Sequence, residues 1–265
     1  MSERPAGWGA QHAARFTDPS IIAAYRYRPP YPDALLELLA ALITDEPRVV
    51  LDIGCGPGNI ARPLLRYVDR VDAVDVSAGM IALGKTLPGG DDPRLHWAIG
   101  RAEDAPLHPP YALVTAGASL HWMDWDALLP RLHDALTSHG SLAIVGVDES
   151  KDEPWAPAIR AIIPRYSTNP DFAPLDLIGE LEARGLFARA DNEWTTEPVP
   201  LARTVDDVIE WFHSMSSFSR DLMTPDAVAA FDAEIRAAIT PYTQDGLLPT
   251  HVIGRVVWGK PLRKQ

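Results

Sequence analysis

Three glycines and two carboxylates, Asp52 and Asp75, are the residues with potential chemistry in the stretch VVLDIGCGPGNIARPLLRYVDRVDAVDVS, residues 49–77. Gly54, Gly56 and Gly58 alternate directly after an apolar run. A backbone without Cβ atoms permits positive φ angles and the close approach of a ligand. Asp75 ends a second apolar run, and its two oxygens suit a pair of ribose hydroxyls. This combination predicts a binding site for a nucleoside.

The residues around the glycines indicate which nucleoside to expect. A dinucleotide fingerprint, G-x-G-x-x-G, would place its third glycine where this chain has Asn59, and its helix start would hold a pyrophosphate. Here Asp52 precedes Gly54 by two residues, and a carboxylate at that position suits a ligand that carries a cation. S-adenosylmethionine has an ammonium and a sulfonium group and no phosphate. The pattern therefore favours this ligand over NAD(P).

The elements that position these residues follow from the hydrophobic pattern. Apolar runs rich in β-branched residues predict strands, and segments with helical spacing lie between them. Such alternation implies parallel pairing with right-handed crossovers, and in open sheets of this kind the ligand lies at the carboxyl ends of the strands. Strands are predicted at 49–53, 71–76, 94–99, 141–147 and from 111 onward, and helices at 33–42, 59–67, 77–83 and 124–136.

Composition narrows the class of protein. The chain has 265 residues, 46% of them hydrophobic and 23% charged, which suits one large α/β domain with an insertion. Its net charge of -12 argues against binding nucleic acid through phosphates and favours a small-molecule substrate. Neither a signal core nor a run of about 18 apolar residues occurs, so a cytoplasmic protein without membrane association is expected.

Cysteine and histidine usage gives two further expectations. The only cysteine, Cys55, excludes an intrachain disulfide, and its place inside the glycine loop indicates a small filler residue more than a nucleophile. No His/Cys cluster has zinc spacing and no acidic loop has the pattern of a calcium site, so no metal is expected.

Several segments resemble those of a known enzyme family. LDIGCGPGN (51–59) and VDAVDVSAGMI (71–81) resemble the first two motifs of class I S-adenosylmethionine-dependent methyltransferases. YRYRPPYP (25–32), GRAEDAPL (100–107) and the segment 111–124 resemble the subfamily that includes trans-aconitate methyltransferase. The resemblance covers residues 16–147 well and the remainder loosely. It implies an α/β fold: a Rossmann-like, seven-stranded, mostly parallel sheet with helices on both faces, an antiparallel C-terminal strand pair and a helical substrate cap.

The resemblance also implies a set of residues around S-adenosylmethionine. Arg28 would pair with the methionine carboxylate and Tyr25 would cover the ligand; alternatively, Arg28 is a surface arginine and Tyr25 packs on the sheet. Met80 would lie beneath or beside the adenine, or else fill the core. Backbone N–H groups near Ala102 and the side chain of Glu103 would face the adenine edge, unless Glu103 is a solvated loop carboxylate. The full set is Tyr25, Arg28, Asp52, Gly54, Cys55, Gly56, Gly58, Asp75, Val76, Met80, Ala102, Glu103 and Ala118.

Two positions depart from the family pattern. Relatives often have an acidic or uncharged polar residue where this chain has Arg101, which cannot accept a hydrogen bond from the adenine amino group. Glu103 is therefore the expected acceptor. Ala112 replaces the usual aspartate at the start of the segment 111–124, which bears on a loop contact and not on the fold.

The domain organisation is expected to have three parts. Residues 1–30 form an arm and cofactor lid, 31–148 the Rossmann-like core, and 149–265 the last strands of the same domain with a substrate cap inserted at about 150–175 and 203–240. Aromatic and methionine side chains gather in this last part, which suggests an apolar or aromatic substrate. The alternative is that they form the core of a helical layer. The substrate contacts expected are Trp122, Trp155, Tyr166, Trp211 and Met215.

The expected chemistry is transfer of a methyl group from sulfur to a small-molecule nucleophile. A carboxylate acceptor needs no base, whereas a hydroxyl must lose a proton. His121 is the best-placed base, although His-Trp also recurs as a packing element in this subfamily, and His213 is a weaker candidate. O-methylation, of a carboxylate or hydroxyl, is favoured narrowly over N-methylation. The alternatives are a protein that binds the cofactor or S-adenosylhomocysteine without turnover, and an NAD(P)-dependent oxidoreductase. The sequence sets no oligomeric state.

Overall fold

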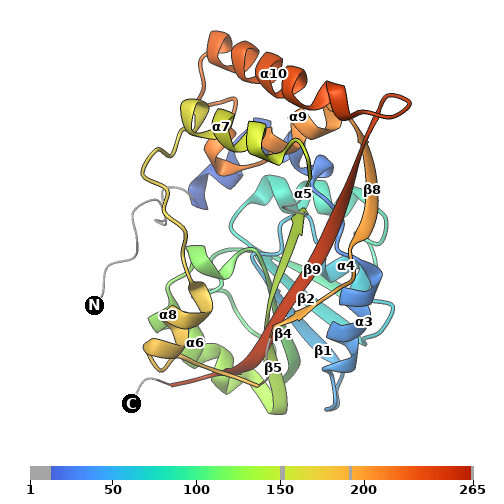
Figure 1. The fold of residues 1–265 in the computed structure, drawn as a ribbon. Coiled ribbons are helices and arrows are strands. Elements are labelled where there is room, and N and C mark those ends of the chain that lie inside the picture. The colour runs from blue at the N-terminus through green and yellow to red at the C-terminus, as the bar shows by residue number, and fades with distance from the viewer. Residues whose placement is uncertain (1–12, 150–152, 191–192, 264–265) are drawn as a thin grey trace. The chain divides into compact units, whose positions relative to one another are not determined.

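The computed structural model describes residues 13–149, 153–190 and 193–263 (Figure 1). The chain divides into two compact units, which we call the sheet unit (residues 30–147, 175–196 and 254–265) and the helical unit (residues 1–29, 148–174 and 197–253). The first 12 residues of the expected arm, and residues 150–152 of the expected cap, lie outside the described residues.

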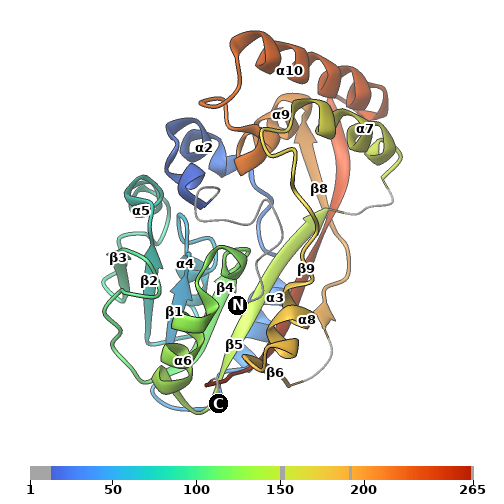
Figure 2. The ribbon, with the colours of Figure 1, turned by 90° about the vertical axis from the view of Figure 1, so that its left-hand side faces the viewer.

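The strands form a sheet with the order β3-β2-β1-β4-β5-β9-β6, and β7 and β8 pair with β9 (Figure 2). Pairing is parallel for β1 with β2 and β4, for β2 with β3, and for β4 with β5, whereas β6, β7 and β8 are antiparallel to β9. The bounds are β1 Val49–Ile53, β2 Arg70–Asp75, β3 Leu95–Ile99, β4 Tyr111–Gly117, β5 Leu136–Glu149, β6 Phe187–Arg189, β7 Trp194–Thr195, β8 Val199–Thr204 and β9 Leu247–Pro261.

The predicted α/β fold class is confirmed, since a mostly parallel sheet carries helices on both faces. All five residues of β1 are buried, as a central parallel strand requires. Val49, Leu51 and Ile53 pack on the side of α6 and α8, and Val50 packs on the side of α3 and α4. The helices of the sheet unit are α3 Asp33–Ala41, α4 Ala61–Leu64, α5 Ala78–Thr86, η3 Leu120–Trp122, α6 Trp125–Ala135 and α8 Leu177–Ala183.

The helical unit has its own apolar core. α10 packs on α7 and α9 (Figure 1), and aromatic side chains fill the space among them. Phe231 of α10 stacks on Phe218 with 4.9 Å between ring centroids and meets Phe212 edge-on at 5.7 Å. The helices of this unit are η1 Ala14–Thr17, α2 Pro19–Ala24, η2 Tyr25–Tyr27, α7 Ala156–Tyr166, α9 Val205–His213, η4 Ser216–Phe218, α10 Pro225–Ile239 and η5 Thr240–Tyr242.

Several element boundaries differ from the predicted ones. The helix expected at 59–67 is reduced to α4, because the N–H groups of Leu65, Arg66 and Tyr67 bond to carbonyls three residues back instead of four. β6 and β7 are short strands of three and two residues. β8 contains Pro200, which a strand tolerates where its missing N–H group is not needed. Among the described residues β8 pairs only with β9, so its other edge needs no N–H group at Pro200.

The close pairing of β6 and β9 yields a stability prediction. A Cβ atom on Gly259 would lie 2.1 Å from the carbonyl oxygen of Ala188, whereas one on Gly146 of β5 would meet no atom closer than 4.0 Å. We expect Gly259→Ala to lower the free energy of unfolding by about 1–3 kcal/mol, because the backbones must separate. Gly146→Ala, the control, should change it by less than about 0.5 kcal/mol. Urea denaturation measures both, and equal stabilities would contradict the pairing.

Candidate cofactor site

The glycine loop begins where β1 ends. Gly54, Gly56 and Gly58 have φ angles of 61°, 55° and 77°, in the left-handed region that favours glycine. A Cβ atom on Gly54 would lie 2.4 Å from the Cβ of Ser119, so a larger residue would displace the loop after β4. The positive φ angles and, at Gly54 and Gly58, close packing against Ser119 and Trp97 therefore require glycine; Gly54 is partly exposed, whereas Gly56 and Gly58 are buried.

Asp75, at the end of β2, holds this loop. Its Oδ2 accepts a hydrogen bond from the N–H of Gly56 at 2.8 Å, and its Oδ1 accepts one from the N–H of Ser77 at 2.7 Å. Burial raises the pKa of Asp75, although the two N–H donors act in the opposite direction. Each carboxylate oxygen can accept a second hydrogen bond, so Asp75 retains acceptors for ribose hydroxyls.

Asp52 lies on β1 and is buried, with 1% of its surface exposed. Its Oδ1 accepts a hydrogen bond from the hydroxyl of Thr115 on the neighbouring strand β4, at 2.8 Å. Burial raises the pKa of Asp52 to about 7, and the nearby charge of Asp75 adds to the effect. Burial makes the ionised form of this carboxyl group unfavourable, and a cationic ligand nearby would stabilise that form.

A third set of contacts follows β3. Glu103 is buried, and its Oε1 accepts a hydrogen bond from the N–H of Asp124 at 2.7 Å and lies 3.4 Å from Arg101. Burial raises the pKa of Glu103, but the Asp124 N–H and the Arg101 guanidinium outweigh it, so the pKa lies below its ordinary value. Glu103 is thus not a solvated loop carboxylate, the alternative left open by the sequence.

The remaining expected contacts of the sheet unit differ in exposure. Val76, directly after β2, has 45% of its surface exposed, whereas Met80 on α5 has 2%. Burial raises the pKa of the Cys55 thiol, which fits a filler residue and not a nucleophile. Ala118 has a φ of 49°, uncommon outside glycine, and Ser119 beside it donates to the carbonyl of Ile53 at 2.7 Å. The loop after β4 is therefore fastened to the end of β1.

His121 and Trp122 lie together on η3. Their rings are 4.5 Å apart between centroids. This contact agrees with the packing interpretation of the His-Trp pair and leaves the role of His121 as a base, and of Trp122 at the substrate, as predictions.

Tyr25 and Arg28 belong to the helical unit. Arg28 donates from Nε to Oγ of Ser214 at 3.1 Å and from an Nη to the carbonyl of Ser214 at 2.7 Å. Its guanidinium lies 4.8 Å from the ring centroid of Tyr25. The described part of the arm is thereby attached to the end of α9, and the cofactor roles of both residues remain predictions.

The expected substrate contacts of the helical unit take part in its core. Trp155 has 4% of its surface exposed, and Tyr166, Trp211 and Met215 are partly buried against the same cluster. The hydroxyl of Tyr166 donates to Glu234 at 2.7 Å. These contacts fit the alternative of a helical-layer core, most clearly for Trp155, and the substrate roles stay predictions.

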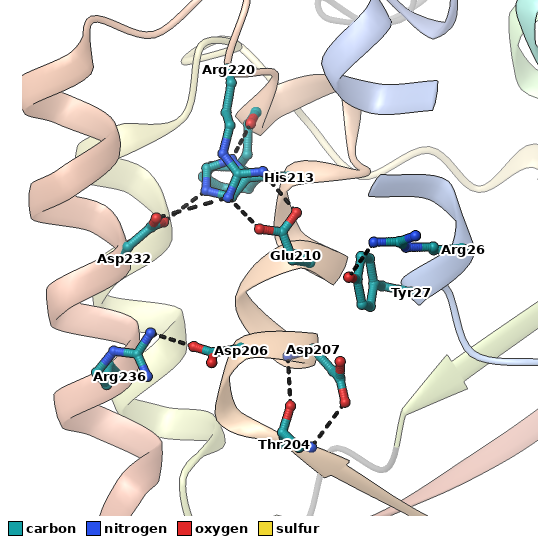
Figure 3. Close-up of polar contacts among 11 residues, drawn as sticks. Arg26, Tyr27, Thr204, Asp206, Asp207, Glu210, His213, Arg220, Asp232 and Arg236 are labelled. Carbon is teal, nitrogen blue, oxygen red and sulfur yellow. Dashed lines mark hydrogen bonds and ion pairs between the residues drawn. The ribbon is translucent and has the colours of Figure 1, made fainter. Parts of the chain in front are cut away.

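His213 is held inside the helical unit (Figure 3). Its ring has no exposed surface, with Nδ1 2.8 Å from the carbonyl oxygen of Phe218 and Nε2 2.7 Å from Asp232 on α10. Arg220 pairs with Glu210 at 2.7 Å and lies 3.9 Å from Asp232. Both ring nitrogens of His213 therefore face acceptors that join α9 to its neighbours, which favours a structural role over that of a base.

Sequence reasoning missed two polar side chains of the site, Thr115 and Ser119. Thr115 stands opposite Asp52 in the register of β1 and β4. A polar residue inside the apolar run from Tyr111 was a usable signal, but the strand register that pairs it with Asp52 was not known from the sequence.

The fold and this geometry define a class. Residues 50–140 match a methyltransferase domain model. The fold matches that of a proposed type II methyltransferase from Anaeromyxobacter dehalogenans with a TM-score of 0.62 at 22% identity, over 88% of this chain and 97% of that one. Residues 50–140 therefore carry a methyltransferase domain, and the expectation of a class I enzyme with S-adenosylmethionine as its cofactor agrees with this match.

Among curated proteins, the chain resembles trans-aconitate 2-methyltransferases. It is 34% identical to the one from Methylobacterium nodulans over 174 residues, which cover 63% of this chain and 58% of that relative. It is 29% identical to the one from Streptomyces avermitilis over 247 residues, 84% of this chain and 88% of that relative. A third such relative, from Methylobacterium radiotolerans, is matched over 48% of its length. The two alternative functions find no support in these similarities.

No helix in the part of the chain that the structure describes is long and apolar enough to cross a bilayer. The described residues also contain no group of three or more His, Cys, Asp or Glu side chains arranged to hold a metal ion.

The raised pKa of Asp52 predicts a pH dependence of stability. The folded protein binds this proton up to about pH 7, whereas an unfolded aspartate releases it near its ordinary pKa of 3.8. The stabilising contribution of this bound proton to the free energy of unfolding is therefore present at low pH and is lost as pH rises to about 7. Between pH 5 and 8 we expect the parent to lose about 2 kcal/mol more unfolding free energy than Asp52→Asn does.

Urea denaturation at the two pH values measures this difference. Asp33→Asn is the matched control, because the Asp33 side chain is 78% exposed. A parent and an Asp52→Asn variant with the same pH dependence would show that Asp52 does not titrate as its burial requires.

Proposed function

We propose that this protein transfers the methyl group of S-adenosylmethionine to an oxygen atom of a small-molecule acceptor, with a carboxylate as the favoured acceptor. The observation that carries the proposal is the glycine loop held by Asp75 at the carboxyl edge of parallel strands. The acceptor class is supported by relatives named for methylating trans-aconitate, an organic acid.

The residues present suit this cofactor. Asp75 would accept hydrogen bonds from the ribose, the positive-φ backbone from Gly54 to Gly58 would lie against the amino acid part, and the carboxylate of Asp52 would favour a cationic ligand. Val76 and Ile99, at the ends of β2 and β3, are 45% and 64% exposed and would offer apolar surface to the adenine.

The bound cofactor supplies an electrophilic methyl group. The chain's own residues bind the cofactor and the acceptor, align them and exclude water. A carboxylic acid has an ordinary pKa near 4, so it is already ionised at neutral pH and needs no base. His121 becomes necessary only for a hydroxyl acceptor, whose proton must be removed. The helical unit is proposed to contribute four ligand contacts: Tyr25 and Arg28 to the cofactor, and Trp211 and Met215 to the acceptor.

Cofactor binding can be tested first. Asp75→Ala removes the acceptor of the Gly56 and Ser77 N–H groups, and Gly56→Val places a branched side chain at a φ of 55°. We expect each to weaken binding of S-adenosylhomocysteine at least about ten-fold in titration calorimetry, because hydrogen bonds to charged groups contribute about 1.5–3 kcal/mol. Asp33→Ala, at an exposed position, should bind like the parent. Folded variants with parental affinity would refute this site.

Catalysis needs a separate measurement. Methyl transfer from labelled cofactor to a panel of organic acids, phenols and amines should label acids first, and His121→Gln should retain activity on acids while losing it on phenols. Loss of activity on acids in His121→Gln would contradict the carboxylate mechanism. Binding of S-adenosylhomocysteine without any labelled product would indicate a non-catalytic binding protein.

A further inference from the structure

The side chain of Arg131, on helix α6, makes several hydrogen bonds to the segment that follows β3. One Nη of Arg131 donates to the carbonyl oxygen of Ala102 at 2.9 Å and also to that of Glu103, and the other Nη donates to the carbonyl oxygen of Ala105 at 2.8 Å. One guanidinium thus bonds to three carbonyls of the segment 101–105. A planar group with five N–H donors suits this arrangement, which a lysine ammonium does not reproduce.

A second link runs in the opposite direction. The N–H of Asp124, just before α6, donates to the carboxylate of Glu103, and the Asp124 side chain accepts the N–H of Ala127 and so caps the helix. Leu128, Leu129 and Leu132 are fully buried against the sheet. Arg131 therefore extends from a helix that is held in place by its cap and by its buried leucines. Its hydrogen bonds hold the segment 101–105 against that helix.

The segment lies at the edge that holds Asp75. The N–H of Gly100 donates to the carbonyl oxygen of Asp75 at 2.9 Å. Within the segment, the N–H groups of Asp104 and Ala105 both bond to the carbonyl of Arg101, at 3.1 and 2.8 Å. Among the described residues, the N–H of Ala102 makes no comparable bond to a backbone carbonyl.

We infer that Arg131 is a positioning residue that fixes the segment 101–105 in the geometry that recognises the adenine of the cofactor. The inference rests on the proposed function. The Ala102 N–H and the Glu103 carboxylate are the donor and acceptor that an adenine edge requires, and a site built to hydrogen-bond an amino group discriminates against a ligand without one. Arg131 touches no ligand and acts through this segment.

The test compares two ligands that differ only at this edge of the base. S-adenosylhomocysteine carries the adenine amino group and an acceptor at N1, whereas S-inosylhomocysteine carries an oxygen in place of the amino group and an N–H donor at N1. We expect the parent to bind the first more tightly and Arg131→Ala to reduce the ratio of the two dissociation constants about ten-fold, with Arg131→Lys in between. In kinetics, Arg131→Ala should raise KM for S-adenosylmethionine and leave kcat unchanged. Arg66→Ala, which removes an exposed pair with Asp33, is the control.

Each outcome bears on the inference. A ratio unchanged from the parent, with both ligands weakened equally, would show that Arg131 only stabilises the fold and would overturn it. The inference also fails if the parent does not discriminate between the ligands. If Arg131→Ala does not fold, Arg131→Lys decides alone by the same ratio. A parent that binds neither ligand, with Asp75→Ala no different, would overturn the proposed function itself.

Discussion

The hydrogen bonds from the N–H groups of Gly56 and Ser77 to Asp75 are the interaction on which the site depends. They join the glycine loop after β1 to the end of β2, so two neighbouring parallel strands present their carboxyl ends as one surface. The left-handed φ of Gly56 aims its N–H at the carboxylate. Without that anchor the loop would lose its only charge-assisted bond to β2 found among the described residues, and the cradle would lose its shape.

Carboxylates at this edge are held by neutral backbone donors more than by cations. Asp75 bonds to two N–H groups, Asp52 to a threonine hydroxyl, and Glu103 to the N–H of Asp124 with Arg101 at a longer distance. Burial therefore raises the pKa of Asp52 and of Asp75, since no cation among the described residues offsets the cost of desolvation. A cationic ligand would relieve part of that cost, which is consistent with S-adenosylmethionine as the cofactor.

The helical unit is held together by aromatic packing and a side-chain polar network. Its aromatic residues pack on one another, as Phe231 does on Phe218, and its polar network joins α9 to α10 through His213 and Asp232 (Figure 3). This core fully buries Trp155, one of the aromatic side chains that the sequence suggested for substrate binding. Those that remain partly exposed, Tyr166, Trp211 and Met215, are the ones left for an acceptor.

The sequence by itself determined the parallel strands of the sheet, the glycine loop and Asp75, because these depend on local patterns: apolar runs, glycines at fixed spacing and an acidic strand end. Only the tertiary structure decided that Thr115 supports Asp52, that both nitrogens of His213 are engaged and that Arg131 reaches three carbonyls. Apart from the contact of His213 with Phe218, five positions away, these contacts join residues 19 to 63 positions apart. At such separations the partner is set by strand register and helix packing, which no local pattern encodes.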